Sequence, residues 1–117
     1  MNAETLRQYI PDIVACLTPL EPDKIILFGS GARETTADVG DLDLIVVTHT
    51  DHLPQTHREK EAVYLPVAQA LRPIRRRIPL DVIVHTRPMH AKFLALDSQF
   101  ARRVRQEGEV LYESHHR

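Results

Sequence analysis

The chain has 117 residues, of which 43% are hydrophobic and 26% charged, a composition typical of one soluble globular domain over residues 1–117. The formal net charge of −1 offers no global electrostatic reason to bind nucleic acid or a membrane surface, so we expect neither. No apolar run reaches the roughly 18 residues of a membrane span, and the first ten residues lack the pattern of a signal peptide. The single cysteine, Cys16, cannot form an internal disulfide, which favours a reducing, cytoplasmic setting.

The chain begins with a helical pattern. Apolar residues three and four positions apart predict an amphipathic helix over residues 3–17. Pro11 either interrupts this helix or begins a second one, because it lacks the N–H group and crowds the preceding turn. Pro19 and Pro22 then bracket a turn, and the apolar residues 25–28 predict the first strand.

A glycine-rich turn follows this strand. It reads Gly29-Ser30-Gly31 and leads into a short predicted helix over residues 31–36. Gly29 allows close approach of the backbone to a ligand, and Ser30 stands where a helix would begin. The free N–H groups and the positive dipole end of a helix start attract anions. The turn therefore predicts a phosphate site.

The second predicted strand, over residues 41–47, carries two carboxylates. Side chains alternate between the faces of a strand, so Asp41 and Asp43 point the same way, roughly 7 Å apart along the strand. Such a pair can bind one hard cation or two neighbouring ones. Magnesium prefers oxygen ligands and is usually bound by one or two carboxylates together with substrate phosphates. The strand–helix–strand unit thus predicts a site for both magnesium and phosphate.

The middle of the chain continues the alternation of helices and strands. Residues 48–57 predict a loop, and the spacing of its three histidines favours a solvated loop over a metal site. Residues 58–71 predict a helix that Pro66 would kink, and residues 72–77 a basic connector. A third strand over residues 80–85 places Asp81 near its start, on the face shared by Ile83 and His85.

Helical patterns then cover residues 88–96 and 97–106, and Gly108 is a helix stop. Residues 109–112 are expected to be a short last strand or an extended tail. The apolar residues on these two helices fit either the core or an interface, and we expect most of them to lie in the core; they include Phe93, Leu94, Leu96, Phe100 and Val104. Helices alternating with three or four strands indicate an α/β sandwich with a small mixed sheet.

Two short motifs and one later aspartate resemble the signature of a known family. They are Gly29-Ser30-x-Ala32-Arg33, Asp41-x-Asp43-Leu44, and Asp81 in the third predicted strand. The family is the polymerase-beta-like nucleotidyltransferases, and the resemblance, which covers nearly the whole chain, is to its minimal, single-domain branch. Members of this branch are often antitoxins encoded beside a HEPN-type toxin.

This resemblance implies an α/β (α+β) fold with a small mixed sheet, and an enzyme that uses Mg²⁺ as cofactor and ATP as substrate. Asp41, Asp43 and Asp81 would be the catalytic residues and metal ligands, while Gly29, Ser30 and Arg33 would bind the nucleotide. A hydroxyl would attack the α-phosphorus of the triphosphate and pyrophosphate would leave. In relatives paired with a HEPN toxin, that hydroxyl belongs to a tyrosine of the toxin.

Two positions depart from the family pattern. Glu34 stands where many members have glycine, and Gly40 where they have serine. Neither removes a carboxylate, so metal binding is expected to survive, whereas the negative charge of Glu34 would weaken triphosphate affinity.

Several alternatives stay open at this stage. The chain could neutralise a toxin by binding alone, or transfer a nucleotide to a small molecule or to RNA. Arg33 fits an ordinary exposed helix position as well as a phosphate contact. His85 could sit near the acceptor or pack in the core, and Arg75, Arg76 and Arg77 could be a solvated connector or contact RNA or an acidic partner. The sequence leaves the oligomeric state, whether homo- or hetero-oligomer, undetermined.

Overall fold

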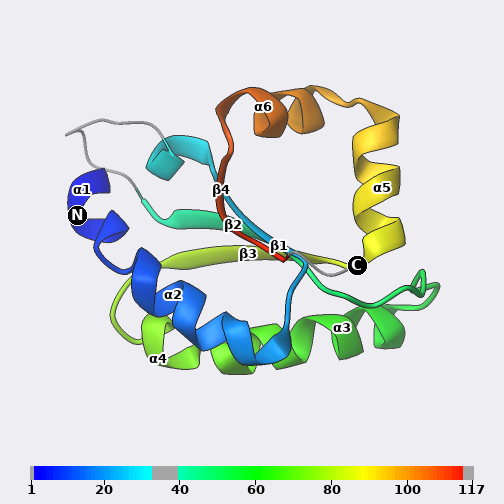
Figure 1. The fold of residues 1–117 in the computed structure, drawn as a ribbon, viewed down its shortest axis with the longest axis horizontal. Coiled ribbons are helices and arrows are strands. Elements are labelled where there is room, and N and C mark those ends of the chain that lie inside the picture. The colour runs from blue at the N-terminus through cyan, green and yellow to red at the C-terminus, as the bar shows by residue number, and fades with distance from the viewer. Residues whose placement is uncertain (1, 33–39, 115–117) are drawn as a thin grey trace.

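The computed structural model describes residues 2–32 and 40–114, which fold around one four-stranded mixed sheet (Figure 1). The strands are β1 (Lys24–Phe28), β2 (Leu42–Val47), β3 (Leu80–His85) and β4 (Glu109–Glu113). Their order across the sheet is β3-β2-β1-β4. β1 is antiparallel to both β2 and β4, whereas β2 is parallel to β3. The predicted mixed sheet is confirmed, and the last segment is a strand rather than a tail.

Helices cover both faces of this sheet (Figure 1). One face is covered by helices that precede β1 or connect β2 to β3, namely α1 (Ala3–Arg7), α2 (Ile10–Leu17), the 3₁₀ helix η1 (Thr18–Leu20), α3 (His57–Ala70) and α4 (Arg72–Arg75). On the other face lie α5 (Arg87–Leu96) and α6 (Gln99–Glu107), which connect β3 to β4. A second 3₁₀ helix, η2 (Gly29–Ala32), directly follows β1.

The alternation of side chains along the strands divides the core in two. The larger core packs α1, α2, α3 and α4 against the strand residues Ile25, Leu27, Leu42, Leu44, Val46, Val82 and Val84. The smaller core lies under α5 and α6 and consists of Ile26, Ile45, Val47 and Val104, with Phe28, Ile83 and Phe93 packed against it. The second face is therefore less thickly covered.

The structure decides between the two roles predicted for Pro11 and corrects the prediction for residues 72–77. Residues 3–17 form two helices, and Pro11 stands in the first turn of the second, where its missing N–H group costs nothing. The expected connector contains the short helix α4, because Ile74 turns inward and is only 5% exposed. Pro66 lies inside α3, the helix predicted over residues 58–71.

The helix expected after the glycine-rich turn is seen only as η2, since residues 33–39 lie outside the described part of the chain. None of the helices in the described ranges is long and apolar enough to cross a lipid bilayer.

Candidate metal centre

Asp41, Asp43 and Asp81 come together at one end of the sheet. Asp43 and Asp81 are register partners in the parallel pair of β2 and β3, so their side chains lie next to each other on the same face. Asp41 precedes Asp43 by two residues and shares that face. Each of the three carboxylates offers an oxygen atom, and these atoms all lie within 4.8 Å of one another. We call this group the acidic trio.

The acidic trio is accessible from solvent. Asp41 and Asp43 are partly buried, and Asp81 is exposed. Asp43 and Asp81 are the second residues of β2 and β3, and Asp41 directly precedes β2, so all three lie at the end of the sheet to which η2 and α4 also lead. A ligand can therefore reach the carboxylates without passing through the core.

The electrostatics of the trio favour a bound cation. Burial first, and then the negative charges of Asp41 and Asp81, raise the pKa of Asp43 to about 6. Like charges held this close disfavour ionisation, and an opposite charge relieves the repulsion. A set of only oxygen ligands suits Mg²⁺, Mn²⁺ or Ca²⁺ rather than a softer metal. The residues present thus fit the divalent cation that the family resemblance implies.

Gly29 brings the glycine-rich turn against this site. Its φ is +73°, a backbone conformation that glycine adopts readily and other residues rarely do. A Cβ atom at this position would overlap the carboxylate oxygen Oδ2 of Asp43. Glycine at position 29 therefore both permits the left-handed backbone conformation of the turn and leaves space for the Asp43 carboxylate. Ser30 follows in the backbone of η2, and Arg33 lies outside the described residues, as does Glu34.

Phe28 is a neighbour of the trio that sequence reasoning missed. It is the register partner of Asp43 in the antiparallel pair of β1 and β2, and it packs on the same face. Phe28, Asp43 and Asp81 thus form one row across three strands. The signal was in the sequence, because Phe28 directly precedes Gly29 and alternates with the residues of the larger core.

His85 packs in the core and does not belong to the site. It shares the face of Asp81, as predicted, but lies four residues further along β3, or about 13 Å at the usual rise per residue. It is only 9% exposed, and its Nδ1 atom lies 3.0 Å from Nδ1 of His90. Its ring centroid is 5.1 Å from that of Phe93. Burial and the charge of His90 lower the pKa of His85 to about 4.

The loop histidines are solvated, as predicted. His49, His52 and His57 are all exposed, and Nδ1 of His49 lies 3.0 Å from the carbonyl oxygen of Glu21. Within the described ranges, the acidic trio is the only group of three or more His, Cys, Asp or Glu residues that could reach one metal ion.

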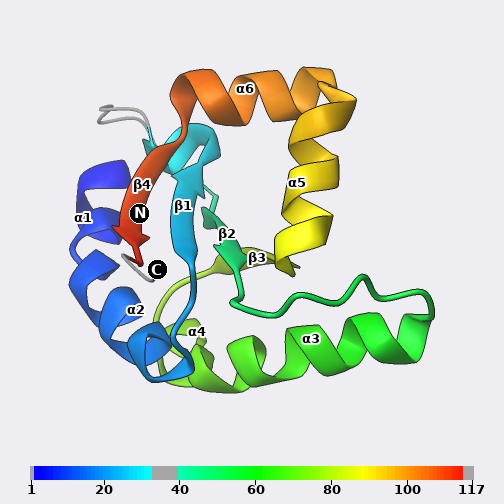
Figure 2. The same cartoon turned by 45° about the vertical axis from the view of Figure 1, so that its right-hand side comes forward.

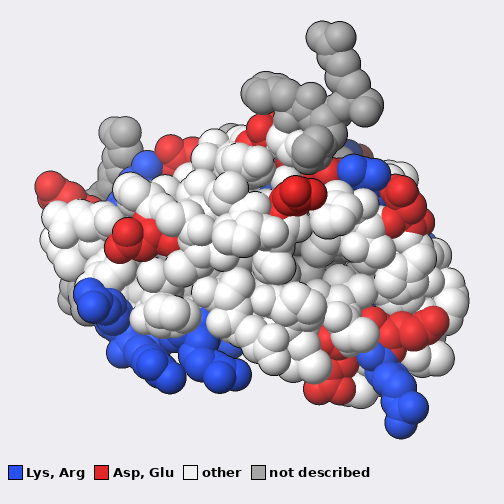
Figure 3. All heavy atoms as spheres, turned by 60° about the horizontal axis from the view of Figure 1, so that its bottom comes forward, with Lys and Arg blue, Asp and Glu red and all other residues white. Residues whose placement is uncertain are grey.

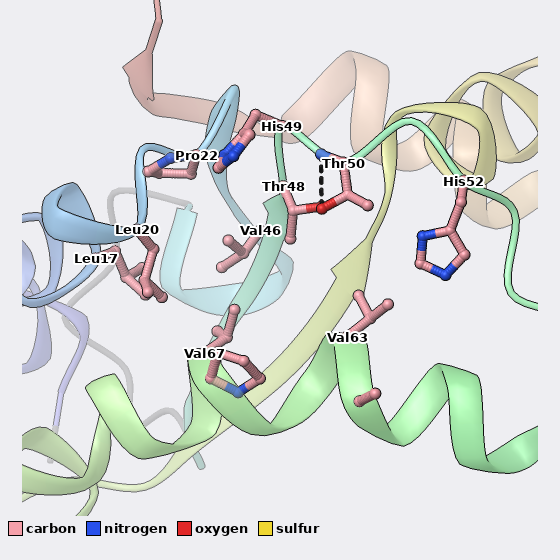
Figure 4. A pocket seen from close by; sticks show the side chains of 12 residues that line it. Leu17, Leu20, Pro22, Val46, Thr48, His49, Thr50, His52, Val63 and Val67 are labelled. Carbon is pink, nitrogen blue, oxygen red and sulfur yellow. Dashed lines mark hydrogen bonds between the residues drawn. The ribbon is translucent and has the colours of Figure 1, made fainter.

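A separate apolar hollow of about 270 Å³ lies between η1, β2 and α3 (Figure 4). Leu20, Val46, Val63 and Val67 are among its lining residues. Val46 belongs to the larger core, on the opposite face from Asp43, and stands near the other end of β2. The hollow is therefore remote from the acidic trio.

A basic surface, defined by the exposed residues Arg72, Arg75, Arg76 and Arg77, lies on and just after α4. Figure 3 shows basic side chains gathered at the end of the molecule where α4 lies. Arg75 Nη2 donates a hydrogen bond to the hydroxyl oxygen of Tyr64 at 3.0 Å. The segment leads directly into β3, so the basic surface lies at the same end of that strand as Asp81.

Comparison with known proteins supports the fold. No family model matches the chain, and no curated protein sequence matches it either. Among solved structures, a chain of a crystal structure of a toxin–antitoxin MntA-HpeT mutant is similar, with a TM-score of 0.53 and 18% sequence identity. The similarity covers 91% of this chain and 74% of that chain. At this level of identity it establishes likeness of fold, and the predicted α/β class with a small mixed sheet is confirmed.

Proposed function

We propose that this chain is a magnesium-dependent nucleotidyltransferase that acts as an antitoxin, transferring AMP from ATP to a tyrosine hydroxyl of a HEPN-type toxin. The observation that carries the proposal is the convergence of three carboxylates within 4.8 Å at the starts of β2 and β3, directly beside the Gly29 turn. The likeness of fold to a chain of a toxin–antitoxin complex supports a toxin as the partner.

The three carboxylates would divide two tasks between them. Asp41 and Asp43 would hold the ion that binds the triphosphate, and Asp81 would complete a second ion site and accept the proton of the attacking hydroxyl. Asp81 suits this task because it is the exposed member of the trio. Two bound Mg²⁺ ions would stabilise the charge on the attacking and leaving oxygens.

The reaction needs no further co-reactant. The acceptor oxygen forms a bond to the α-phosphorus while the bond from that phosphorus to the β-phosphate oxygen breaks. Pyrophosphate leaves with the electron pair of that bond. The backbone N–H groups of the turn at Gly29 and Ser30 would bind the departing phosphates, together with the guanidinium group of Arg33.

A second candidate is an antitoxin that neutralises its partner by binding alone. The basic surface on α4 favours it, because four exposed arginines can pair with a partner's carboxylates without any contribution from the acidic trio. In that case the trio would be a relic of an enzyme.

Co-expression with the toxin distinguishes the two functions. The Asp41→Asn/Asp43→Asn double variant removes two metal ligands while keeping the size of both side chains. Asp12→Asn is a matched control, because Asp12 is exposed on α2. If the chain acts as an enzyme, the double variant should still bind the toxin but no longer restore growth of the cells. The Asp12→Asn control should restore growth. Full rescue by the double variant would instead establish neutralisation by binding.

A further inference from the structure

Phe28, Phe100 and Phe93 form a row of aromatic rings that begins beside the acidic trio. The ring centroids of Phe28 and Phe100 are 5.3 Å apart and those of Phe93 and Phe100 are 5.5 Å apart, and both pairs are T-shaped. Phe28 is the cross-strand neighbour of Asp43, and Cβ atoms of such neighbours lie about 5 Å apart. The aromatic row therefore extends directly from the candidate metal centre.

Phe100 is the member of this row that is open to solvent. It is 40% exposed, whereas Phe28 and Phe93 are partly buried. Of the five apolar residues on the last two helices that were expected to lie mostly in the core, Leu96 and Phe100 are exposed. The helix of Phe100, α6, crosses the end of the sheet where β1 leads into η2 (Figure 2). Two T-shaped contacts fix the ring without covering it, so a planar ligand could stack on it at little cost in conformational entropy.

We infer that Phe100 is the stacking platform for the base of the nucleoside triphosphate. The inference rests on the proposed function, which puts the α-phosphate at the acidic trio. Only the ribose separates the α-phosphate from the base, so a base that turns toward β1 reaches the aromatic row. Every base has a π-face that stacks on an aromatic side chain, and such stacking tolerates different bases.

The order of the strands favours the base over the ring of an acceptor tyrosine. Phe28 and the Gly29 turn lie on the β1 side of Asp43, where the triphosphate is proposed to bind. Asp81 lies on the β3 side, where it would receive the acceptor hydroxyl. Nucleotide and acceptor would thus approach Asp43 from opposite sides, and the aromatic row belongs to the nucleotide side.

Calorimetric titration with two ligands separates the base from the phosphates. The full chain is titrated with Mg²⁺–ATP and with Mg²⁺–tripolyphosphate, which has no base. Phe100→Leu keeps an apolar side chain but removes the π-face, and Phe100→Tyr keeps an aromatic ring. Leu96→Ala is the matched control, because Leu96 is a 72% exposed apolar residue on the neighbouring helix α5.

We expect Phe100→Leu to weaken ATP binding by roughly tenfold, the size of one base–aromatic stacking contact, and to leave tripolyphosphate binding unchanged. Phe100→Tyr and Leu96→Ala should bind both ligands like the wild type. Two results would overturn the inference and leave the proposed function intact. One is equal ATP affinity in Phe100→Leu and the wild type, and the other is an equal loss of affinity for ATP and for tripolyphosphate in Phe100→Leu. A wild-type chain that binds neither ligand would overturn the proposed function, and the inference with it.

Discussion

Gly29 leaves the space that the Asp43 carboxylate occupies. A Cβ atom at position 29 would overlap Oδ2 of Asp43 and lie 3.3 Å from its Cγ atom, and the φ of +73° disfavours any other residue there. The turn after β1 and the Asp43 carboxylate are therefore one structural unit, in which a side chain at position 29 would displace the carboxylate.

Replacing Gly29 by alanine should damage both stability and the site. We expect the free energy of unfolding to fall by about 1–3 kcal/mol because the left-handed backbone conformation becomes strained. The displaced Asp43 should also bind Mg²⁺ more weakly. Chemical denaturation and metal titration measure the two effects. Gly40→Ala is the control, since a Cβ atom at Gly40 would meet no atom within 4 Å. The free energy of unfolding of this variant should equal that of the wild type.

Asp43→Asn should make the metal-free chain more stable to unfolding while abolishing its stabilisation by Mg²⁺. The pKa of Asp43 is raised to about 6, so its ionised form is disfavoured in the folded chain without metal. We expect the metal-free variant to gain up to about 1 kcal/mol in unfolding free energy, after allowance for solvent screening. Mg²⁺ at tenfold its dissociation constant should raise the melting temperature of the wild type by roughly 5 °C and leave that of the variant unchanged. A variant that is less stable without metal would contradict the repulsion among the three carboxylates.

Asp81→Asn should impair transfer more than nucleotide binding. Asp81 is the exposed member of the trio, and Asp41 and Asp43 remain to bind the ion on the triphosphate. Loss of a proton acceptor lowers the transfer rate by about a hundredfold or more. Stopped-flow transfer assays and ATP titration measure rate and affinity independently. If ATP affinity fell as much as the rate, the proposed division of tasks within the trio would be wrong.

The buried His85 should make the protein less stable in acid. Its folded pKa of about 4 lies below the value of 6.5 for an unperturbed histidine. Below pH 6.5, His85 is protonated in the unfolded chain but stays neutral in the folded chain. The free energy of unfolding therefore falls as the pH drops from about 6.5 toward 4. Burial and the charge of Lys24 lower the pKa of His90 as well, which acts in the same direction.

His85→Asn removes this titration and keeps a hydrogen-bonding side chain beside His90. We expect the wild type to lose about 1 kcal/mol more than the variant between pH 7.5 and pH 5, after allowance for solvent screening. The raised pKa of Asp43 acts in the opposite direction below pH 6 but equally in both proteins. Identical pH dependence in urea denaturation would mean that His85 does not titrate differently on folding.

Sequence reasoning predicted which carboxylates share a face, because the period of a strand decides which side chains lie on the same side of a sheet. The alternation of side chains along a strand was enough to predict that Asp41 and Asp43 share one face, and that Asp81 and His85 share one face. It could not predict that β3 pairs with β2 in parallel, because this pairing depends on the crossover through α3 and α4. The register that sets Asp43 beside Asp81 therefore came from the structure.

The exposure of Phe100 was missed for a related reason. Hydrophobic periodicity predicts which residues of a helix share a side, but not how far that side extends past the sheet beneath it. Val104 is 5% exposed and Phe100 is 40% exposed although both lie on α6. The smaller core under α5 and α6 covers less of the sheet than the larger core does, and Phe100 lies at its margin.

The central claim is that the acidic trio directs transfer of a nucleotide to a partner protein. Intact-mass spectrometry tests it on the protein encoded beside this chain, after incubation of the two with ATP and Mg²⁺. The proposed function predicts that the partner gains one or more adenylate units with the wild type, and none with the Asp41→Asn/Asp43→Asn double variant. An unchanged partner mass, with the complex formed and the partner still inhibited, would contradict it.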